Sequence, residues 1–176
     1  MKKLLSAIIS VCLFSSLFTT ALASDRTNPA PEDYGDPIFE TTYYDEELDA
    51  TIVERTYFVP DAITTFDNLS GRGWRKNEKE IRWNNSSANV TKYFVEAYFV
   101  WGNGKSTVSN ARKGYDWLPA GYTVTRDEVV TGEGQYGFIF NHYSYATYYL
   151  SLSNNKSNLH KKLDVTIRVS ESGNNI

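Results

Sequence analysis

Residues 159–169 read LHKKLDVTIRV, and the alternation in this stretch decides the fold class. One parity is apolar, with Lys161 as its exception, and consists of Leu159, Leu163, Val165, Ile167 and Val169. The other parity is polar and consists of His160, Lys162, Asp164, Thr166 and Arg168. A period of two places the two sets on opposite faces of a β-strand. The stretch therefore predicts a strand that covers a core with one face and meets solvent with the other.

A second stretch, residues 92–101 (KYFVEAYFVW), predicts a central strand. One of its faces is wholly apolar and consists of Tyr93, Val95, Ala97, Phe99 and Trp101. Gly102-Asn103-Gly104 follows and precedes another strand-like run, residues 105–109. Asn and Gly tolerate positive φ, so this sequence predicts a tight hairpin.

The rest of the chain after residue 50 also has strand character and almost no helical periodicity. Further strands are expected at 51–59, 77–83 and 145–152. A second hairpin is expected at residues 131–134 (TGEG), joining 121–130 to 135–141. We therefore expect residues 50–176 to form one all-β domain, an immunoglobulin-like antiparallel β-sandwich of about 7–8 strands.

The N-terminus is typical of an export signal. Lys2 and Lys3 precede an apolar run, residues 4–17, and Ala21-Leu22-Ala23 provides small residues for cleavage. We expect residues 1–23 to be a signal peptide and the protein to be secreted, either extracellular or associated with the cell wall. The apolar run is short for a membrane span, so no stable membrane anchor is expected.

Charge is distributed unevenly over the remaining chain. Residues 24–67 contain twelve acids and two bases, whereas residues 68–176 contain nine acids and fourteen bases. Residues 24–49 are acidic and hold three of the five prolines. We expect them to form a mostly disordered linker, with two alternative roles. They would be a solubilising spacer, or a pro-segment that masks a basic surface until it is removed.

Composition excludes several kinds of site. The single cysteine, Cys12, lies in the expected signal peptide, which leaves no disulfide and no cysteine-based zinc site. The sequence contains no P-loop, no dinucleotide fingerprint and no nucleophile elbow. We expect a protein that is not an enzyme and has no cofactor and no metal. A hydrolase would use either Glu96 or His142, together with a nearby carboxylate.

Aromatic side chains supply the first set of candidate binding residues. Tyr143, Tyr145 and Tyr149 share a parity with Thr147, so they predict an outward-facing tyrosine row. Flat aromatic rings can stack on the apolar faces of sugars while hydroxyls form hydrogen bonds. Strand propensity alone also explains exposed tyrosines. Tyr115 and Trp117 lie in an expected loop, where aromatic residues either bind ligands or close the end of the core.

A basic stretch supplies the second set. It contains Arg72, Arg75, Lys76, Lys79 and Arg82. These residues could bind a polyanion, or they could protect an edge strand from pairing with other chains. Strand alternation would put Lys76 and Arg82 on one face and Arg75 and Lys79 on the other. Nucleic acid is not expected as a partner, because the chain carries a net charge of -3.

Residues 93–109, YFVEAYFVWGNGKSTVS, resemble a pattern in small β-sandwich proteins exported by Gram-positive bacteria. In that pattern an apolar and aromatic strand runs into a Gly-containing turn and then into a Ser/Thr-rich strand. The resemblance covers about 110 residues and implies the fold and the location. The group has no assigned activity, so the resemblance implies no mechanism.

These observations favour a secreted, non-catalytic β-sandwich that binds cell-wall glycan or another envelope polymer, whether a polysaccharide or a polyanion. The first alternative is a secreted antibacterial or toxin-like factor masked by its acidic segment. The second is a glycan hydrolase. The sequence leaves the ligand and the oligomeric state open.

Overall fold

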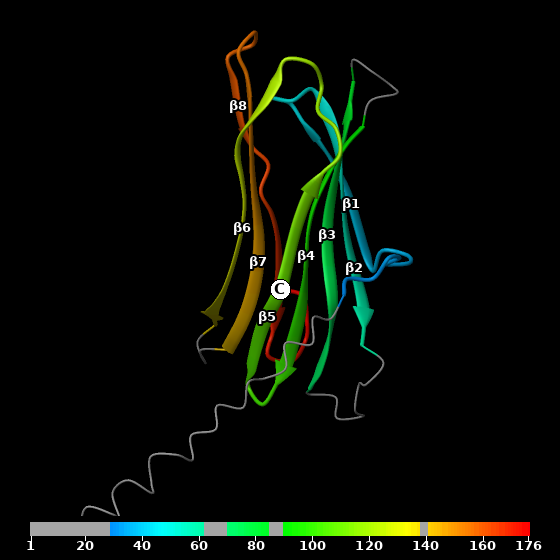
Figure 1. Ribbon diagram of the computed structural model, residues 1–176, viewed down its shortest axis with the longest axis vertical. Coiled ribbons are helices and arrows are strands. Elements are labelled where there is room, and N and C mark those ends of the chain that lie inside the picture. Colours follow the sequence, from blue (N-terminus) through cyan, green and yellow to red (C-terminus); the bar gives the residue numbers. More distant parts are fainter. Residues whose placement is uncertain (1–28, 62–69, 85–89, 138–140) are drawn as a thin grey trace, which may run out of the picture.

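The computed structural model describes residues 29–61, 70–84, 90–137 and 141–176, which form two antiparallel sheets packed face to face (Figure 1). Sheet A contains, in spatial order, β1 (Phe39–Asp45), β2 (Ala50–Pro60), β3 (Gly71–Trp83), β4 (Val90–Gly102) and β5 (Lys105–Tyr115). Sheet B contains β6 (Tyr122–Tyr136), β7 (Asn141–Asn154), β8 (Leu159–Lys162) and β9 (Val165–Ser170). The predicted antiparallel β-sandwich is confirmed, with nine strands over these residues. The expected signal peptide, residues 1–23, lies outside them.

The strand order is that of two meanders. Sheet A follows the sequence order from β1 to β5, and in sheet B the central strand β7 pairs with β6, β8 and β9. The chain passes from one sheet to the other between β5 and β6. An immunoglobulin domain differs in this respect, because its Greek-key connections cross between the sheets several times.

The inner faces of both sheets form the core that the alternation predicted. In β4, Tyr93, Val95, Ala97 and Phe99 are at most 1 % exposed. In sheet B the core side chains of β7 and β9 are Ala146, Tyr148, Leu150, Leu152, Val165, Ile167 and Val169. Burying these apolar surfaces between the layers is the main favourable contribution to folding.

The two predicted hairpins have different outcomes. The hairpin at 102–104 is confirmed, because β4 ends at Gly102, β5 begins at Lys105 and Asn103 has a φ of 53°. The prediction of a hairpin at 131–134 is wrong. β6 continues through these residues to Tyr136, and both glycines pair across to tyrosines of β7. Their role is to make room for tyrosine rings, as described below.

The acidic segment 24–49 was expected to be a linker without regular structure, and residues 39–45 correct this expectation. They form β1, which pairs along its whole length with β2. The Lys161 ammonium of β8 then binds Asp45 at 2.8 Å and Glu47 at 2.6 Å. The sheet therefore begins before residue 50, and the acidic segment carries an edge strand of the domain.

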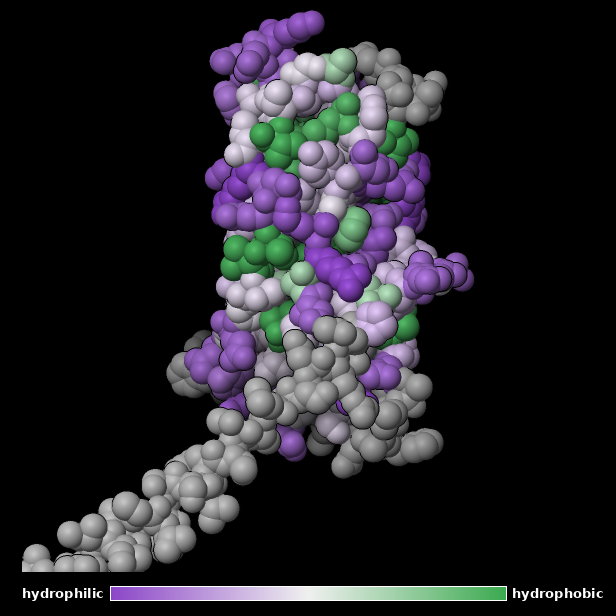
Figure 2. All heavy atoms as spheres, in the orientation of Figure 1, coloured by the Kyte–Doolittle hydropathy of each residue, from purple (hydrophilic) through white to green (hydrophobic). Residues whose placement is uncertain are grey.

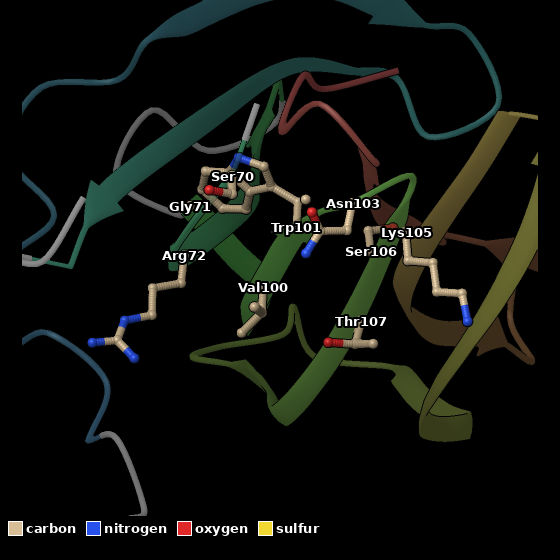
Figure 3. A pocket seen from close by; sticks show the side chains of 10 residues that line it. Ser70, Gly71, Arg72, Val100, Trp101, Asn103, Lys105, Ser106 and Thr107 are labelled. Atoms are coloured by element: carbon tan, nitrogen blue, oxygen red, sulfur yellow. The ribbon is translucent and has the colours of Figure 1, made fainter. Parts of the chain in front are cut away.

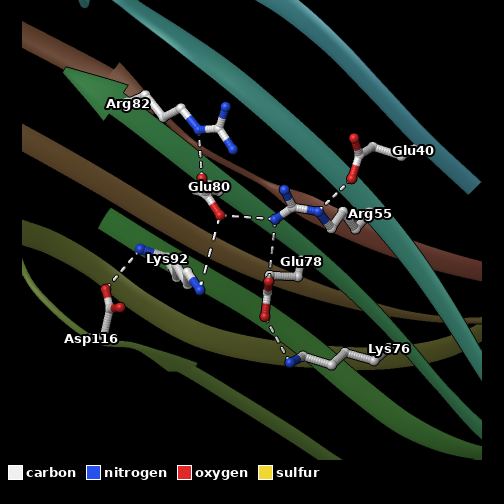
Figure 4. Close-up of polar contacts among 8 residues, drawn as sticks. All are labelled: Glu40, Arg55, Lys76, Glu78, Glu80, Arg82, Lys92 and Asp116. Atoms are coloured by element: carbon white, nitrogen blue, oxygen red, sulfur yellow. Dashed lines mark hydrogen bonds and ion pairs between the residues drawn. The ribbon is translucent and has the colours of Figure 1, made fainter. Parts of the chain in front are cut away.

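The outer face of sheet A is a network of paired charges (Figure 4). At its centre, the Glu80 carboxylate accepts hydrogen bonds from Arg55 at 2.8 Å and from Arg82 at 2.6 Å. Lys76 binds Glu78 at 2.7 Å. Figure 2 shows the molecule in the orientation of Figure 1, with hydrophobic residues in small groups between hydrophilic ones.

Candidate functional site

The tyrosine row predicted on β7 lines a groove on the outer face of sheet B. We call this the tyrosine groove and define it by its lining residues, Tyr143, Tyr145, Thr147, Tyr149, Asp164, Thr166 and Arg168. Its volume is about 340 Å³. Four of these residues come from β7 and the others from β9 and the residue before it. Opposite-parity residues of β7 are buried in the core, so the sandwich fixes the direction of the tyrosines.

Two glycines of β6 allow the tyrosine rings to lie against the sheet. Gly132 pairs with Tyr145, and Gly134 pairs with Tyr143. A Cβ atom added at Gly132 would lie 2.6 Å from the Tyr145 hydroxyl oxygen, and one at Gly134 would overlap the Tyr143 ring. Glycine is therefore required at both positions for the rings to cross β6 in this way.

The tyrosines continue beyond the groove as a row of rings. The ring centroids of Tyr143 and Tyr145 are 6.1 Å apart, and those of Tyr136 and Tyr143 are also 6.1 Å apart. These separations lie in the range of favourable aromatic pairs. Tyr136, the last residue of β6, thus extends the aromatic surface in the direction of the strand end.

The polar side of the groove comes from the residues that alternate along β9. Thr166 lies opposite Thr147, and their hydroxyl oxygens are 2.9 Å apart. Arg168 lies opposite Tyr145, is exposed, and places its guanidinium 6.0 Å from the Tyr143 ring centroid. It has no ion-pair partner among the described side chains.

Asp164 is the other charged residue of the groove. Its Oδ1 atom is buried and has no hydrogen-bond partner in the part of the chain that the structure describes. A buried carboxylate oxygen without a partner is costly, and such an atom calls for an explanation.

One face of the Tyr149 ring is covered by a charged side chain. The Arg126 guanidinium stacks over its ring at 4.0 Å from the centroid, and Arg126 in turn binds Glu128. A ligand can reach this face of Tyr149 only after Arg126 moves. The open aromatic surface is therefore centred on Tyr143 and Tyr145.

The sequence pointed to the tyrosines of this groove but not to its other side. Asp164, Thr166 and Arg168 were recognised as the polar face of the last strand, yet nothing in the sequence paired that strand with β7. The signal that could have found this side of the groove is that residues 143–149 and residues 164–168 each have a polar face, and two such faces come together when the strands pair. Tyr136 was missed because the hairpin was expected between it and the preceding residues of β6.

The predicted loop pair lies elsewhere. Tyr115 is the last residue of β5 and Trp117 lies in the connection to β6. Their exposed fractions are 40 % and 37 %. Neither lines the tyrosine groove.

The basic stretch of β3 is divided between the two faces of sheet A, as its alternation predicts. Arg75 points into the sandwich, where it is 5 % exposed and donates a hydrogen bond to the Gly173 carbonyl at 2.7 Å. It stacks 3.7 Å from the centroid of the Phe58 ring, and burial lowers its pKa to about 10. Lys79 lies on the same face and binds Glu54 at 3.5 Å.

The outward-facing bases of this stretch are also paired. Arg72 lies 3.1 Å from Asp61, Lys76 binds Glu78, and Arg82 binds Glu80. Lys76 is further surrounded by three aromatic rings, those of Tyr34, Tyr57 and Phe94, at 4.8 to 5.6 Å. The structure thus divides the five bases between the two faces of the sheet, and Lys76 and Arg82 belong to one network through Glu78, Arg55 and Glu80.

A second hollow lies beside the 102–104 hairpin (Figure 3) and has a volume of about 420 Å³. Arg72 and Lys105 lie at its two sides, and Trp101 lies at its inner end. The Trp101 ring is enclosed by glycines, because a Cβ atom at Gly71 would lie 2.7 Å from it and one at Gly173 would overlap it. The Trp101 ring is partly exposed and is the one aromatic side chain in the described lining of this hollow, whereas three tyrosines line the tyrosine groove.

The residues considered for catalysis do not meet at one site. Glu96 is in sheet A, is 8 % exposed and accepts a hydrogen bond from the Tyr34 hydroxyl at 3.0 Å. His142 is a partly buried residue of β7 in sheet B, and His160 is exposed on β8. Within the described ranges, no three His, Cys, Asp or Glu side chains are arranged to hold a metal ion. These ranges also include no helix long and apolar enough to cross a membrane.

Comparisons with known proteins identify no relative. No protein-family model, no curated protein and no solved structure matches the chain.

Proposed function

We propose that this protein is secreted and non-catalytic, and that it binds the glycan of a cell wall or a similar envelope polymer in the tyrosine groove. The observation that carries the proposal is the composition of the groove. Tyrosine rings, threonine hydroxyls, a carboxylate and a guanidinium line one open depression of about 340 Å³. Rings offer stacking surfaces to the apolar faces of sugars, and the polar groups offer hydrogen bonds to sugar hydroxyls.

The shape of the groove also suits a chain molecule. Thr147 separates Tyr145 from Tyr149, so the two tyrosines are roughly 13 Å apart along an extended strand. The smaller threonine leaves a depression between them, with Thr166 beside it. An extended polymer can lie along the strand and contact successive side chains, whereas a compact ligand would contact only one or two.

The test is co-sedimentation of the purified protein with intact bacterial cell walls. At about 50 mM salt we expect the wild type to be retained, and at about 500 mM salt to be retained in part, because stacking is not screened by salt. The variant Tyr145→Ala should bind about tenfold more weakly, since aromatic anchors dominate binding energies. Tyr44→Ala is the matched control, because Tyr44 is an exposed tyrosine of sheet A.

Three results would contradict this proposal. Absence of the wild type from the pellet at both salt concentrations would exclude binding to the wall. Loss of binding with Tyr44→Ala as large as with Tyr145→Ala would show that the groove is not the site. Loss with Trp117→Ala but not with Tyr145→Ala would move the site to the loop between β5 and β6.

A further inference from the structure

The charged side chains beside the tyrosines indicate which class of glycan the groove takes. On the outer face of sheet B, the bases are Arg126, Lys162 and Arg168, and the acids are Glu128 and Asp164. Arg126 and Glu128 bind each other. Two bases and one acid remain, on a chain whose net charge is -3. This face is therefore locally cationic on an acidic protein.

The two remaining bases lie in one line beside the tyrosine row. Lys162 pairs with Ser151, and Arg168 pairs with Tyr145, so both follow the edge of β7. Six residues separate them, or roughly 20 Å along an extended chain. Both side chains are exposed, and neither has an ion-pair partner among the described residues.

We propose that the ligand of the tyrosine groove is an acidic polysaccharide, a polymer of carboxylated sugars of the uronic-acid type. This inference rests on the proposed function. Arg168 would bind a sugar carboxylate through its planar pair of donors, a geometry that suits carboxylates. The neighbouring Tyr143 and Tyr145 would stack on the rings of the same polymer.

Asp164 fits the same ligand at a different point. Asp164 lies four residues before Arg168 and lines the groove, although its Oδ1 atom is enclosed by the protein. Its negative charge would repel a sugar carboxylate at this end of the groove and would tolerate a sugar hydroxyl. A polymer that carries both carboxylates and hydroxyls satisfies both ends of the groove.

The experiment compares two matched hexasaccharides by titration calorimetry. One is a uronic-acid hexasaccharide, and the other is the same molecule with its carboxyls reduced to primary alcohols. The full chain should bind the acidic form about tenfold more tightly, which is the size of a charge-assisted hydrogen bond. This preference should disappear at about 500 mM salt.

Variants connect the preference to the groove. Arg168→Gln should lower the affinity for the acidic hexasaccharide about tenfold and leave the affinity for the reduced form almost unchanged. Arg168→Lys should have an intermediate effect, because it keeps the charge but loses the paired donors. Lys105→Gln is the control for net charge, since Lys105 is an exposed lysine of sheet A in the second hollow.

The outcomes separate the two proposals. Equal affinity for both hexasaccharides overturns this inference and leaves glycan binding intact. An effect of Lys105→Gln as large as that of Arg168→Gln overturns it as well, because attraction would then be general. Binding of a linear polyphosphate as tight as that of the acidic hexasaccharide also overturns it, because polyphosphate has charge but no sugar rings. Failure of both hexasaccharides to bind overturns the inference, and co-sedimentation with cell walls then tests the proposed function separately.

Discussion

The outer faces of the two sheets use polar residues in opposite ways. On sheet A, Glu78, Glu80 and Glu96 are between 7 and 9 % exposed, although they lie on the outside of the sandwich. Arginine, lysine and tyrosine side chains cover them and bind them. On sheet B, by contrast, Asp164 has a buried oxygen without a described partner, and Arg168 has no described ion-pair partner. The charges of the first face are paired with one another, whereas Arg168 on the second face remains available for the ligand that we propose.

The difference follows from which side chains alternate along the strands. β3 places acids and bases at successive outward positions, Lys76, Glu78, Glu80 and Arg82, and long side chains reach their neighbours. The outward positions of β6 and β7 include glycines and threonines, which are too short to cover the sheet. A charge network therefore forms on the five-stranded sheet, and a groove remains on the other.

Removing the centre of the network should give the largest effect. We expect Glu80→Ala to lower the free energy of unfolding by about 2 kcal/mol, because it removes a largely buried carboxylate that accepts charge-assisted hydrogen bonds from Arg55 and Arg82. Urea denaturation measures this change. Binding by the folded variant should be unchanged, since Glu80 lies in the other sheet from the groove.

The control for this variant is Glu128→Ala on sheet B. Glu128 also binds an arginine, but its side chain is 52 % exposed, so we expect a change of about 0.5 kcal/mol or less. Equal losses of stability in the two variants would refute the distinction between the two faces.

Acid should weaken sheet A through the same carboxylate. Burial alone would raise the pKa of Glu80, but the hydrogen bonds from Arg55 and Arg82 outweigh it and hold the pKa below its ordinary value. The unfolded chain therefore takes up this proton at a higher pH than the folded chain does. The stability from Glu80 is complete above the ordinary pKa and is lost as the pH falls through the folded value.

This pH dependence is tested with urea unfolding midpoints measured from pH 7 to pH 3. The wild type should lose stability more steeply at the acidic end than Glu80→Gln, whose amide does not titrate. The stability that protonation of Glu80 removes from the wild type should be smaller than the stability that Glu80→Ala loses at pH 7. The reason is that a protonated carboxyl still accepts hydrogen bonds. Identical slopes for the two proteins would show that Glu80 does not contribute.

The sequence predicted the layers of the molecule better than its connections. Alternation alone identified the buried faces of β4, β7 and β9, since a period of two assigns each side chain to a face. The turn at residues 131–134 was misplaced because glycine marks both turns and positions where another side chain lies against the backbone. Only the register, which places these glycines opposite Tyr143 and Tyr145, distinguishes the two uses.

The site was predictable to the extent that it lies on one strand. Tyr143, Tyr145 and Tyr149 share a parity within a few residues. Asp164 and Arg168 join them through pairing between distant parts of the chain, which local patterns do not specify. The basic stretch shows the converse, because residues close in sequence, such as Arg75 and Lys76, point to opposite faces and have different partners.

The glycines of β6 provide a change that should affect binding but not stability. In Gly134→Val the new side chain would displace the Tyr143 ring from β6. We expect the affinity for glycan to fall about fivefold, because aromatic anchors act only when they are positioned. The unfolding free energy should change by about 0.5 kcal/mol or less, since valine favours strands.

The matched control is Glu133→Val, at the neighbouring exposed residue whose parity is opposite. It introduces the same side chain into the same edge strand without approaching a tyrosine ring. Normal binding by Gly134→Val, or an equal loss in the control, would show that the position of Tyr143 does not matter.

The smallest effect is expected at Tyr149, because a charged side chain already covers its ring, as charged side chains cover the carboxylates of sheet A. Arg126 already covers Tyr149, so Tyr149→Ala should weaken glycan binding only about twofold, against about tenfold for Tyr145→Ala. In an Arg126→Ala background the ring is uncovered, and the same substitution should then cost more. A double-mutant cycle measures this coupling with the carboxyl-reduced hexasaccharide, which carries no charge for Arg126 to attract. If Tyr149→Ala costs the same in both backgrounds, Arg126 does not compete with the ligand for this ring. A tyrosine covered by an arginine and an uncovered tyrosine would then contribute alike to glycan binding. The contrast between side chains that are paired within the protein and side chains that are open to a ligand would not hold within sheet B.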